Sequence, residues 1–124
     1  MADTPTAVLE SLLEGGEDDL FQWWESESFE PDSYEWTASH AECLRQFKAV
    51  LRQVTHEWGT PDSSGTVTVE EGGLCVPDLY PFSICEFVEE VAIWDCSGHV
   101  ACVWWGVMEH RTQFEVCFGV AAGG

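Results

Sequence analysis

Positive charge is scarce in this sequence. Only four of its 124 residues are Lys or Arg, whereas 23 are Asp or Glu, and the formal net charge is −19. Proteins that bind DNA or RNA directly draw much of their affinity from Lys and Arg side chains on the phosphates, so this composition argues against that class. The same charge repels anionic membranes and attracts basic proteins over long distances.

Long apolar runs are also missing. A membrane-spanning helix needs about 20 consecutive apolar residues, and the longest apolar stretch, residues 100–107, has only the length of a strand. The start of the chain, Met-Ala-Asp-Thr-Pro, has neither the basic nor the apolar region of a secretory signal. We therefore expect a cytoplasmic chain whose six cysteines are reduced and mostly buried.

The common catalytic and cofactor motifs are absent from the sequence as well. It contains no phosphate-binding glycine loop, no Gly-x-Ser-x-Gly turn, no His-Glu-x-x-His motif and no Cys-x₂-Cys pair. Paired carboxylates of the glycosidase type cannot be singled out, because any two acids in so acidic a chain appear paired by chance. We expect no cofactor and no enzymatic activity.

One local arrangement keeps a metal protein or small enzyme open as an alternative. A two-residue Ser-Gly turn places Cys96 and His99 opposite each other across a hairpin, about 5 Å apart. His40 and Cys43 show the mirrored spacing, so a Cys₂His₂ zinc site is conceivable, although nothing in the sequence brings the two halves together. Cys43 beside His40 also meets part of the requirement for a reactive thiolate, which the surrounding carboxylates oppose.

One segment predicts its own structure clearly. Ser39 and Glu42 have the spacing of a capping box, and Gly59 and Pro61 are typical of a helix end, so we expect a helix over about residues 40–58. Its apolar side chains recur along a single stripe that is wide enough to cover a sheet. The members of this stripe are Leu44, Phe47, Val50, Leu51, Val54 and Trp58.

The polar side of the same helix carries three of the four cations in the chain. Arg45, Lys48 and Arg52 lie within about 60° of one another at 100° per residue. We expect this stripe to neutralise the chain's own acidic segment. An external anion site, with His56 one turn beyond Arg52, and a solvated helix face are the alternatives.

The remaining segments predict a short helix and a sheet. Thr4 and Pro5 begin a short amphipathic helix that Gly15-Gly16 ends. Residues 62–65 are expected to form a loop, residues 66–70 a strand with a return strand at 74–76, and residues 77–81 a loop fixed by two prolines. Strands are expected at residues 87–94, 99–106 and 113–120, the middle one central because it is apolar on both faces.

Together these elements predict an α+β protein. An antiparallel β-meander packs on one long amphipathic helix at about residues 40–58, and a short N-terminal helix and an acidic aromatic segment form a flap over the second face. We expect a single domain over residues 1–124, made of an acidic N-terminal part (1–36), the main helix (37–61) and the sheet (62–124). The apolar face of the last strand, with Phe114, Val116, Phe118 and Val120, is expected to meet the main helix.

The acidic part of the chain is the basis for a functional prediction. Residues 14–35 contain nine carboxylates and no cation, interleaved with aromatic residues. We expect an ordered, irregular ribbon with one or two helical turns at Leu20, Phe21 and Trp24. If it were fully helical, its carboxylates would be spaced by about 3.7 Å, close to the phosphate spacing of a DNA strand. The rings of Trp23, Trp24, Phe29 and Trp36 would anchor a partner that the carboxylates steer.

We therefore expect an inhibitor that occludes a basic partner such as a nuclease or other toxin, as an immunity protein, antitoxin or nucleic-acid mimic would. In charge and size, though in no motif, the chain is similar to acidic immunity and anti-nuclease proteins, including DNA mimics. The alternative is a non-catalytic scaffold or oligomer subunit whose acidity serves solubility. The expected partner-binding residues are Glu14, Glu17, Asp18, Asp19, Trp23, Trp24, Glu25, Glu27, Glu30, Asp32 and Glu35.

Overall fold

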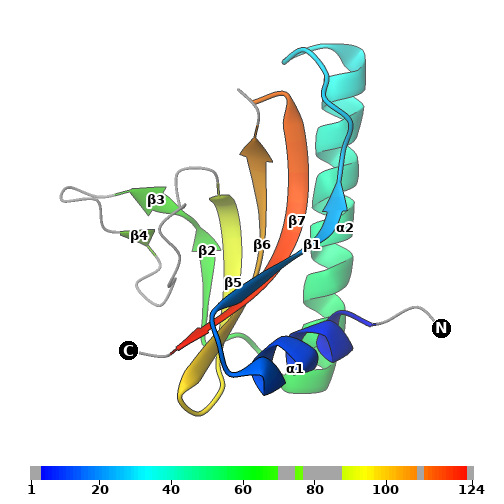
Figure 1. Ribbon diagram of the computed structural model, residues 1–124. Coiled ribbons are helices and arrows are strands. Elements are labelled where there is room, and N and C mark those ends of the chain that lie inside the picture. Colours follow the sequence, from blue (N-terminus) through cyan, green and yellow to red (C-terminus); the bar gives the residue numbers. More distant parts are fainter. Residues whose placement is uncertain (1–3, 70–74, 77–87, 109–110, 123–124) are drawn as a thin grey trace.

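The structure is a computed structural model that describes residues 4–69, 75–76, 88–108 and 111–122 (Figure 1). Two helices, α1 (Pro5–Gly15) and α2 (Tyr34–Trp58), accompany a five-stranded antiparallel sheet. The strands follow the order β1-β7-β6-β5-β2 across this sheet. Their bounds are β1 Asp19–Glu25, β2 Ser63–Thr66, β5 Val88–Asp95, β6 His99–Met108 and β7 Gln113–Ala122. The α+β class and the meander of β5, β6 and β7 are confirmed.

Helix α1 begins and ends where the sequence predicts. The Thr4 side chain accepts a hydrogen bond from the Ala7 amide at 3.1 Å, and Pro5 occupies the first turn, where its missing N–H costs nothing. Gly16 ends the helix in the left-handed conformation, with φ of 72°. Val8 and Leu9 are buried, so α1 docks on the main body of the protein.

Helix α2 begins earlier than predicted. Its N-cap is Ser33, whose side chain accepts a hydrogen bond from the Trp36 amide at 3.2 Å, and the helix then runs for 25 residues. Its predicted end is confirmed, because the Gly59 amide donates to the Thr55 carbonyl at 2.8 Å. The start predicted from Ser39 was therefore wrong, and Ser39 lies inside the helix.

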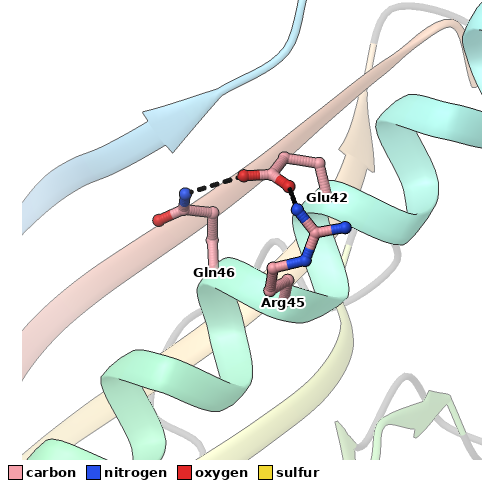
Figure 2. A network of polar contacts seen from close by, with 3 residues as sticks. All are labelled: Glu42, Arg45 and Gln46. Atoms are coloured by element: carbon pink, nitrogen blue, oxygen red, sulfur yellow. Dashed lines mark hydrogen bonds and ion pairs between the residues drawn. The ribbon is translucent and has the colours of Figure 1, made fainter.

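The apparent capping partner, Glu42, has a different role in α2. Its carboxylate pairs with Arg45 one turn later and accepts a hydrogen bond from the Gln46 amide group at 3.0 Å (Figure 2). Both partners lie three or four positions further along the same helix, where side chains on one face meet. The Ser-x-x-Glu spacing thus belongs to a side-chain network in the helix interior.

Both helices pack on the same face of the sheet and form its main core. Cys43, Phe47, Val50 and Val54 of α2 and Val8 and Leu9 of α1 are buried in one cluster with the sheet. From β7 this cluster takes the predicted apolar face, namely Phe114, Val116, Phe118 and Val120. The central position of β6 is also confirmed, because all of its residues except those at its two ends are buried.

The expected N-terminal flap over the second face is wrong. Helix α1 lies on the same face as α2, and the acidic aromatic segment contributes β1 to the sheet itself (Figure 1). The second face carries a separate buried cluster that includes Ile93, Cys102 and Trp104, and Val67 contributes to it. Period-2 apolar alternation on both sides of β6 accounts for the two clusters.

The segment after α2 also differs from expectation. Residues 63–65, predicted as part of a loop, form β2 together with Thr66, because β5 supplies backbone partners from Ile93 to Glu90. The predicted strand at 66–70 is divided, since Val67 separates β2 from β3 (Thr68–Val69) and is buried. The return strand is confirmed as β4 (Cys75–Val76), which pairs with β3. The loop predicted at residues 77–81 lies outside the described residues.

Candidate protein-binding surface

The acidic segment is ordered as the edge strand of the main sheet. β1 pairs antiparallel with β7, from Asp19 opposite Val120 to Glu25 opposite Glu115, with an irregularity between Gln22 and Trp24. The helical turns predicted here are therefore wrong, and so is the helical spacing of carboxylates that resembled DNA. The competing signal was the alternation of Phe21 and Trp23 at period 2, which is typical of a strand.

Two rings of β1 rest on the core side of β7. The ring centroid of Trp23 lies 5.1 Å from that of Phe118, and the ring of Phe21 lies 6.2 Å from it. Phe118 is fully buried. These aromatic contacts fix β1 to the sheet in addition to its backbone pairing.

The chain continues along the edge of β7 after β1 ends. The Ser26 amide donates to the Phe114 carbonyl and the Phe29 amide to the Thr112 carbonyl, both at 2.9 Å. The Trp36 indole then donates to the Arg111 carbonyl at 2.7 Å, which ties the first turn of α2 to the same region. The segment from β1 to α2 is thus held along its length, as an ordered ribbon requires.

All nine carboxylates of residues 14–35 are exposed. They form two groups at the two ends of β1, which as a seven-residue strand spans about 20 Å. The first group is Glu14, Glu17, Asp18 and Asp19; the second is Glu25, Glu27, Glu30, Asp32 and Glu35. The predicted site residues therefore lie along one continuous segment, in two groups rather than in an even row.

The exposed apolar side chains of this surface are not the ones predicted. Trp23 and Trp24 are half-buried and pack against the core. Leu20 and Phe21 are instead 46% and 42% exposed between the two acidic groups, and Tyr34 is 85% exposed at the start of α2. The position of β1 at the sheet edge exposes Leu20 and Phe21, and no sequence pattern reveals which strand lies at an edge.

A groove lies between the end of β1 and the first turns of α2. It has a volume of about 460 Å³. Trp24 and Glu25 belong to β1, and Glu27 and Phe29 belong to the part of the ribbon between β1 and α2. The lining residues are Trp24, Glu25, Ser26, Glu27, Phe29, Tyr34, Glu35, Ala38, Ser39 and Glu42.

The cationic stripe of α2 does not pair with this acidic segment in the part of the chain that the structure describes. The ion pair found there joins Arg45 to Glu42 of the same helix (Figure 2). Lys48 and Arg52 are exposed. The expected clamp on the acidic segment is therefore not formed by an ion pair, and none of its nine carboxylates has an ion-pair partner within the described residues.

Cys43, Cys96, Cys102 and Cys117 are free thiols, and the pKa of each is raised above its ordinary value. Burial, and secondarily the charge of Glu115, raises the pKa of Cys43 to about 12. Burial likewise raises the pKa of Cys102 to about 12. For Cys117, burial and the neighbouring Glu115 raise the pKa further. A thiolate nucleophile needs the opposite shift.

The candidate metal ligands do not come together as a metal site within the described residues. Cys96 and His99 flank the predicted turn, in which Ser97 and Gly98 both have positive φ, and the Cys96 amide donates to the His99 carbonyl at 2.7 Å. His40 instead packs its ring among Phe114, Trp105 and Trp36, with centroid distances of 5.1, 5.4 and 5.8 Å. Among the described residues no group of three or more His, Cys, Asp or Glu gathers to hold a metal ion.

Comparisons with protein-family models, with curated proteins and with solved structures each find no match for this chain. Neither described helix is long and apolar enough to cross a membrane. Function must therefore be inferred from the geometry and charge of the chain itself.

Proposed function

We propose that the chain is an inhibitor that binds a basic protein through the surface formed by residues 14–35, which run from the end of α1 along β1 to the first turn of α2. The partner would be a nuclease or another toxin, and the inhibitor would cover its nucleic-acid or substrate groove, as immunity proteins, antitoxins and nucleic-acid mimics do. One observation supports this most directly. Nine exposed carboxylates and no cation lie in residues 14–35, whose central part, β1, is an edge strand of the sheet.

The arrangement of charge and apolar surface fits this role. Two acidic groups at the ends of β1 would steer a cationic partner, which raises association rates from about 10⁵–10⁶ toward 10⁸–10⁹ M⁻¹s⁻¹. Between them, Leu20 and Phe21 point to opposite faces of this edge strand, and each exposes apolar surface to a partner that covers the edge. Interfaces of this kind have a dry, apolar centre and a polar rim.

A cytoplasmic location is part of the proposal. Cys43, Cys96, Cys102 and Cys117 are free thiols. Free thiols persist in the reducing cytoplasm, whereas oxidising compartments favour disulfides. Inhibition by occlusion needs no catalytic group on the inhibitor, so the proposal includes no enzymatic activity.

The test begins with capture of a partner from the native lysate at low salt and its elution with rising salt. The association rate of the purified pair is then measured by stopped flow between about 0.02 and 0.5 M salt. Over this range the electrostatic screening length falls from more than about 20 Å to a few ångströms. A steep fall is expected. A rate that does not change with salt would falsify electrostatic steering, and a partner without excess positive charge would contradict the proposal.

A matched pair of variants locates the surface. Glu17→Gln with Glu30→Gln removes two charges from it, and neither side chain has a hydrogen bond among the described residues. Glu10→Gln with Glu57→Gln removes two exposed charges from α1 and from the end of α2. The first double variant should slow association several-fold more than the second. Equal slowing by both would show that net charge acts without a defined surface.

One observation favours solubility as a second candidate function. β1 is an edge strand with exposed apolar side chains, and charges at such an edge block pairing with other chains. On this reading, Glu17→Gln with Glu30→Gln should make the free protein self-associate, as sedimentation would show, and the captured material should contain no specific basic partner. A monomeric variant with weakened partner binding would favour the inhibitor instead.

A further inference from the structure

The groove beside β1 combines aromatic surface with negative charge. Its volume of about 460 Å³ lies within the range of about 300–1,000 Å³ that is typical of ligand pockets. Three aromatic side chains line it, one from each adjoining element: Trp24 from β1, Phe29 from the ribbon and Tyr34 from α2. Trp24 and Phe29 are half-buried, whereas Tyr34 is 85% exposed. The groove thus offers aromatic surface that the core leaves uncovered.

The charged side chains that the described residues contribute to the groove are all acidic. Glu25, Glu27 and Glu35 are exposed at its margin. A fourth carboxylate, that of Glu42, is already engaged by Arg45 and Gln46 (Figure 2). Among the described residues that line the groove, none carries a positive charge. A ligand that enters the groove therefore meets a negative potential, which disfavours anions and favours cations.

The start of α2 repels a cation in the groove less than the N-terminus of a helix ordinarily does. The N-terminus of a helix carries partial positive charge on its free amides. Here the Ser33 side chain already accepts from the Trp36 amide, and Glu35 supplies a negative charge in the first turn. The carboxylates and aromatic rings therefore determine which ligands the groove favours.

We propose that this groove holds an arginine side chain of the basic partner, and this rests on the function proposed above. A guanidinium group stacks on aromatic faces and forms paired hydrogen bonds with a carboxylate, so one arginine uses both kinds of surface in the groove. A lysine ammonium is compact and strongly hydrated, which makes it a poorer match to stacked rings. The buried arginine would anchor the complex after the exposed carboxylates have steered it.

The test uses a small probe, Nα-acetyl-arginine methylamide, titrated into the whole ¹⁵N-labelled chain and followed by NMR. The indole signal of Trp24 and the amides of residues 25–29 and 34–39 should shift with saturation. The citrulline analogue has nearly the same shape without the charge and should bind at least about tenfold more weakly; the lysine analogue should bind about threefold more weakly. Equal binding of the citrulline analogue would overturn the proposal, as would arginine shifts spread evenly over all acidic segments.

Variants separate the groove from general acidity. Tyr34→Ala and Glu35→Gln should each weaken binding of the arginine probe about three- to tenfold. Tyr34 is mostly exposed, so its loss leaves the core intact. Phe21→Ala and Glu30→Gln are matched controls, since both alter exposed residues of the same surface outside the groove lining. Control variants that weaken the probe as much as the groove variants would contradict an arginine site.

The inference and the proposed function fail in different ways. If the probe does not bind the groove but salt-dependent association with a basic protein persists, the arginine site is wrong and the inhibitor proposal stands. If the probe binds and no basic protein associates, the inhibitor proposal is wrong and the groove binds arginine in some other context. In that second case the statement that the arginine belongs to a basic partner is overturned.

Discussion

Replacing Ser26 tests whether the acidic ribbon is held to the sheet as the structure shows. The Ser26 side chain accepts a hydrogen bond from the buried Phe114 amide at 2.9 Å and donates to the Glu27 carbonyl at 2.8 Å. The Ser26 amide in turn donates to the Phe114 carbonyl. Where β1 stops pairing with β7, the Ser26 hydroxyl oxygen therefore accepts the hydrogen bond that a backbone carbonyl would accept in a regular sheet. Ser26→Ala removes that acceptor and leaves the Phe114 amide without one.

The expected cost follows from the burial of this pair. Ser26 is only 8% exposed, and leaving a buried donor unsatisfied costs about 1–3 kcal/mol. Domains of this size are stable by about 5–15 kcal/mol, so the loss is readily measured. Ser28→Ala is the matched control, because Ser28 is exposed and its hydrogen bond to the Thr112 hydroxyl lies in solvent. It should cost at most about 0.5 kcal/mol.

Urea unfolding followed by tryptophan fluorescence gives the two free energies of unfolding, and hydrogen exchange reports on the Phe114 amide. We expect Ser26→Ala to lower the unfolding midpoint with an unchanged slope and to speed exchange at Phe114. Equal midpoints for the Ser26 and Ser28 variants, with Phe114 still protected, would refute the assigned role of the serine oxygen. The ribbon would then be held by its backbone pairs and aromatic contacts alone.

Two further predictions concern the core and its thiols. Phe118→Ala should lower the free energy of unfolding by about 3–5 kcal/mol in urea titrations, because Phe118 is fully buried beneath Trp23. Phe21→Ala should lower it by only about 1 kcal/mol, because Phe21 is partly exposed. Similar losses for the two variants would contradict the register of β1. The thiols of Cys43 and Cys102 ionise near pH 9 when unfolded but near 12 when folded, so unfolding releases protons above pH 9. Below pH 9 both states hold these protons and stability is unaffected, whereas above it each thiol should lower stability by up to about 1.4 kcal/mol per pH unit. Cys102→Ala should reduce that slope in urea titrations at pH 8–11, and an unchanged slope would contradict the shift.

Local signals in the sequence sufficed for most of the meander and for the end of α2. The turn at Ser97 and Gly98, the glycine at position 59 and the alternation in β7 each act over a few residues, so they can be recognised without the fold. The start of α2 was missed because Ser39 has Glu42 at capping-box spacing, whereas Ser33, the actual N-cap, is followed at that spacing by Trp36. Packing of Trp36 against Phe114, at a centroid distance of 5.2 Å, favours the earlier cap.

The path of the acidic segment could not be predicted from local patterns. Residues 19–25 form a strand because they pair with the open edge of β7, about 95 residues further along the chain. Local sequence patterns carry no information about pairing between residues so far apart. The same gap explains the errors in the site. Trp23 looked like an exposed anchor but packs on Phe118, whereas Tyr34 received no role and is the most exposed aromatic side chain of the groove.

The way in which the ribbon is held has a consequence for salt. Its support comes from backbone pairs with β7 and from ring packing, and the described residues show no ion pair between it and α2. The nine carboxylates of residues 14–35 repel one another in the free protein, so added salt should stabilise the free fold by screening that repulsion. Salt should weaken the proposed complex for the same reason, because it screens the attraction to a cationic partner. The two effects have opposite signs, and a ribbon clamped by Lys48 and Arg52 would instead lose stability as salt is added.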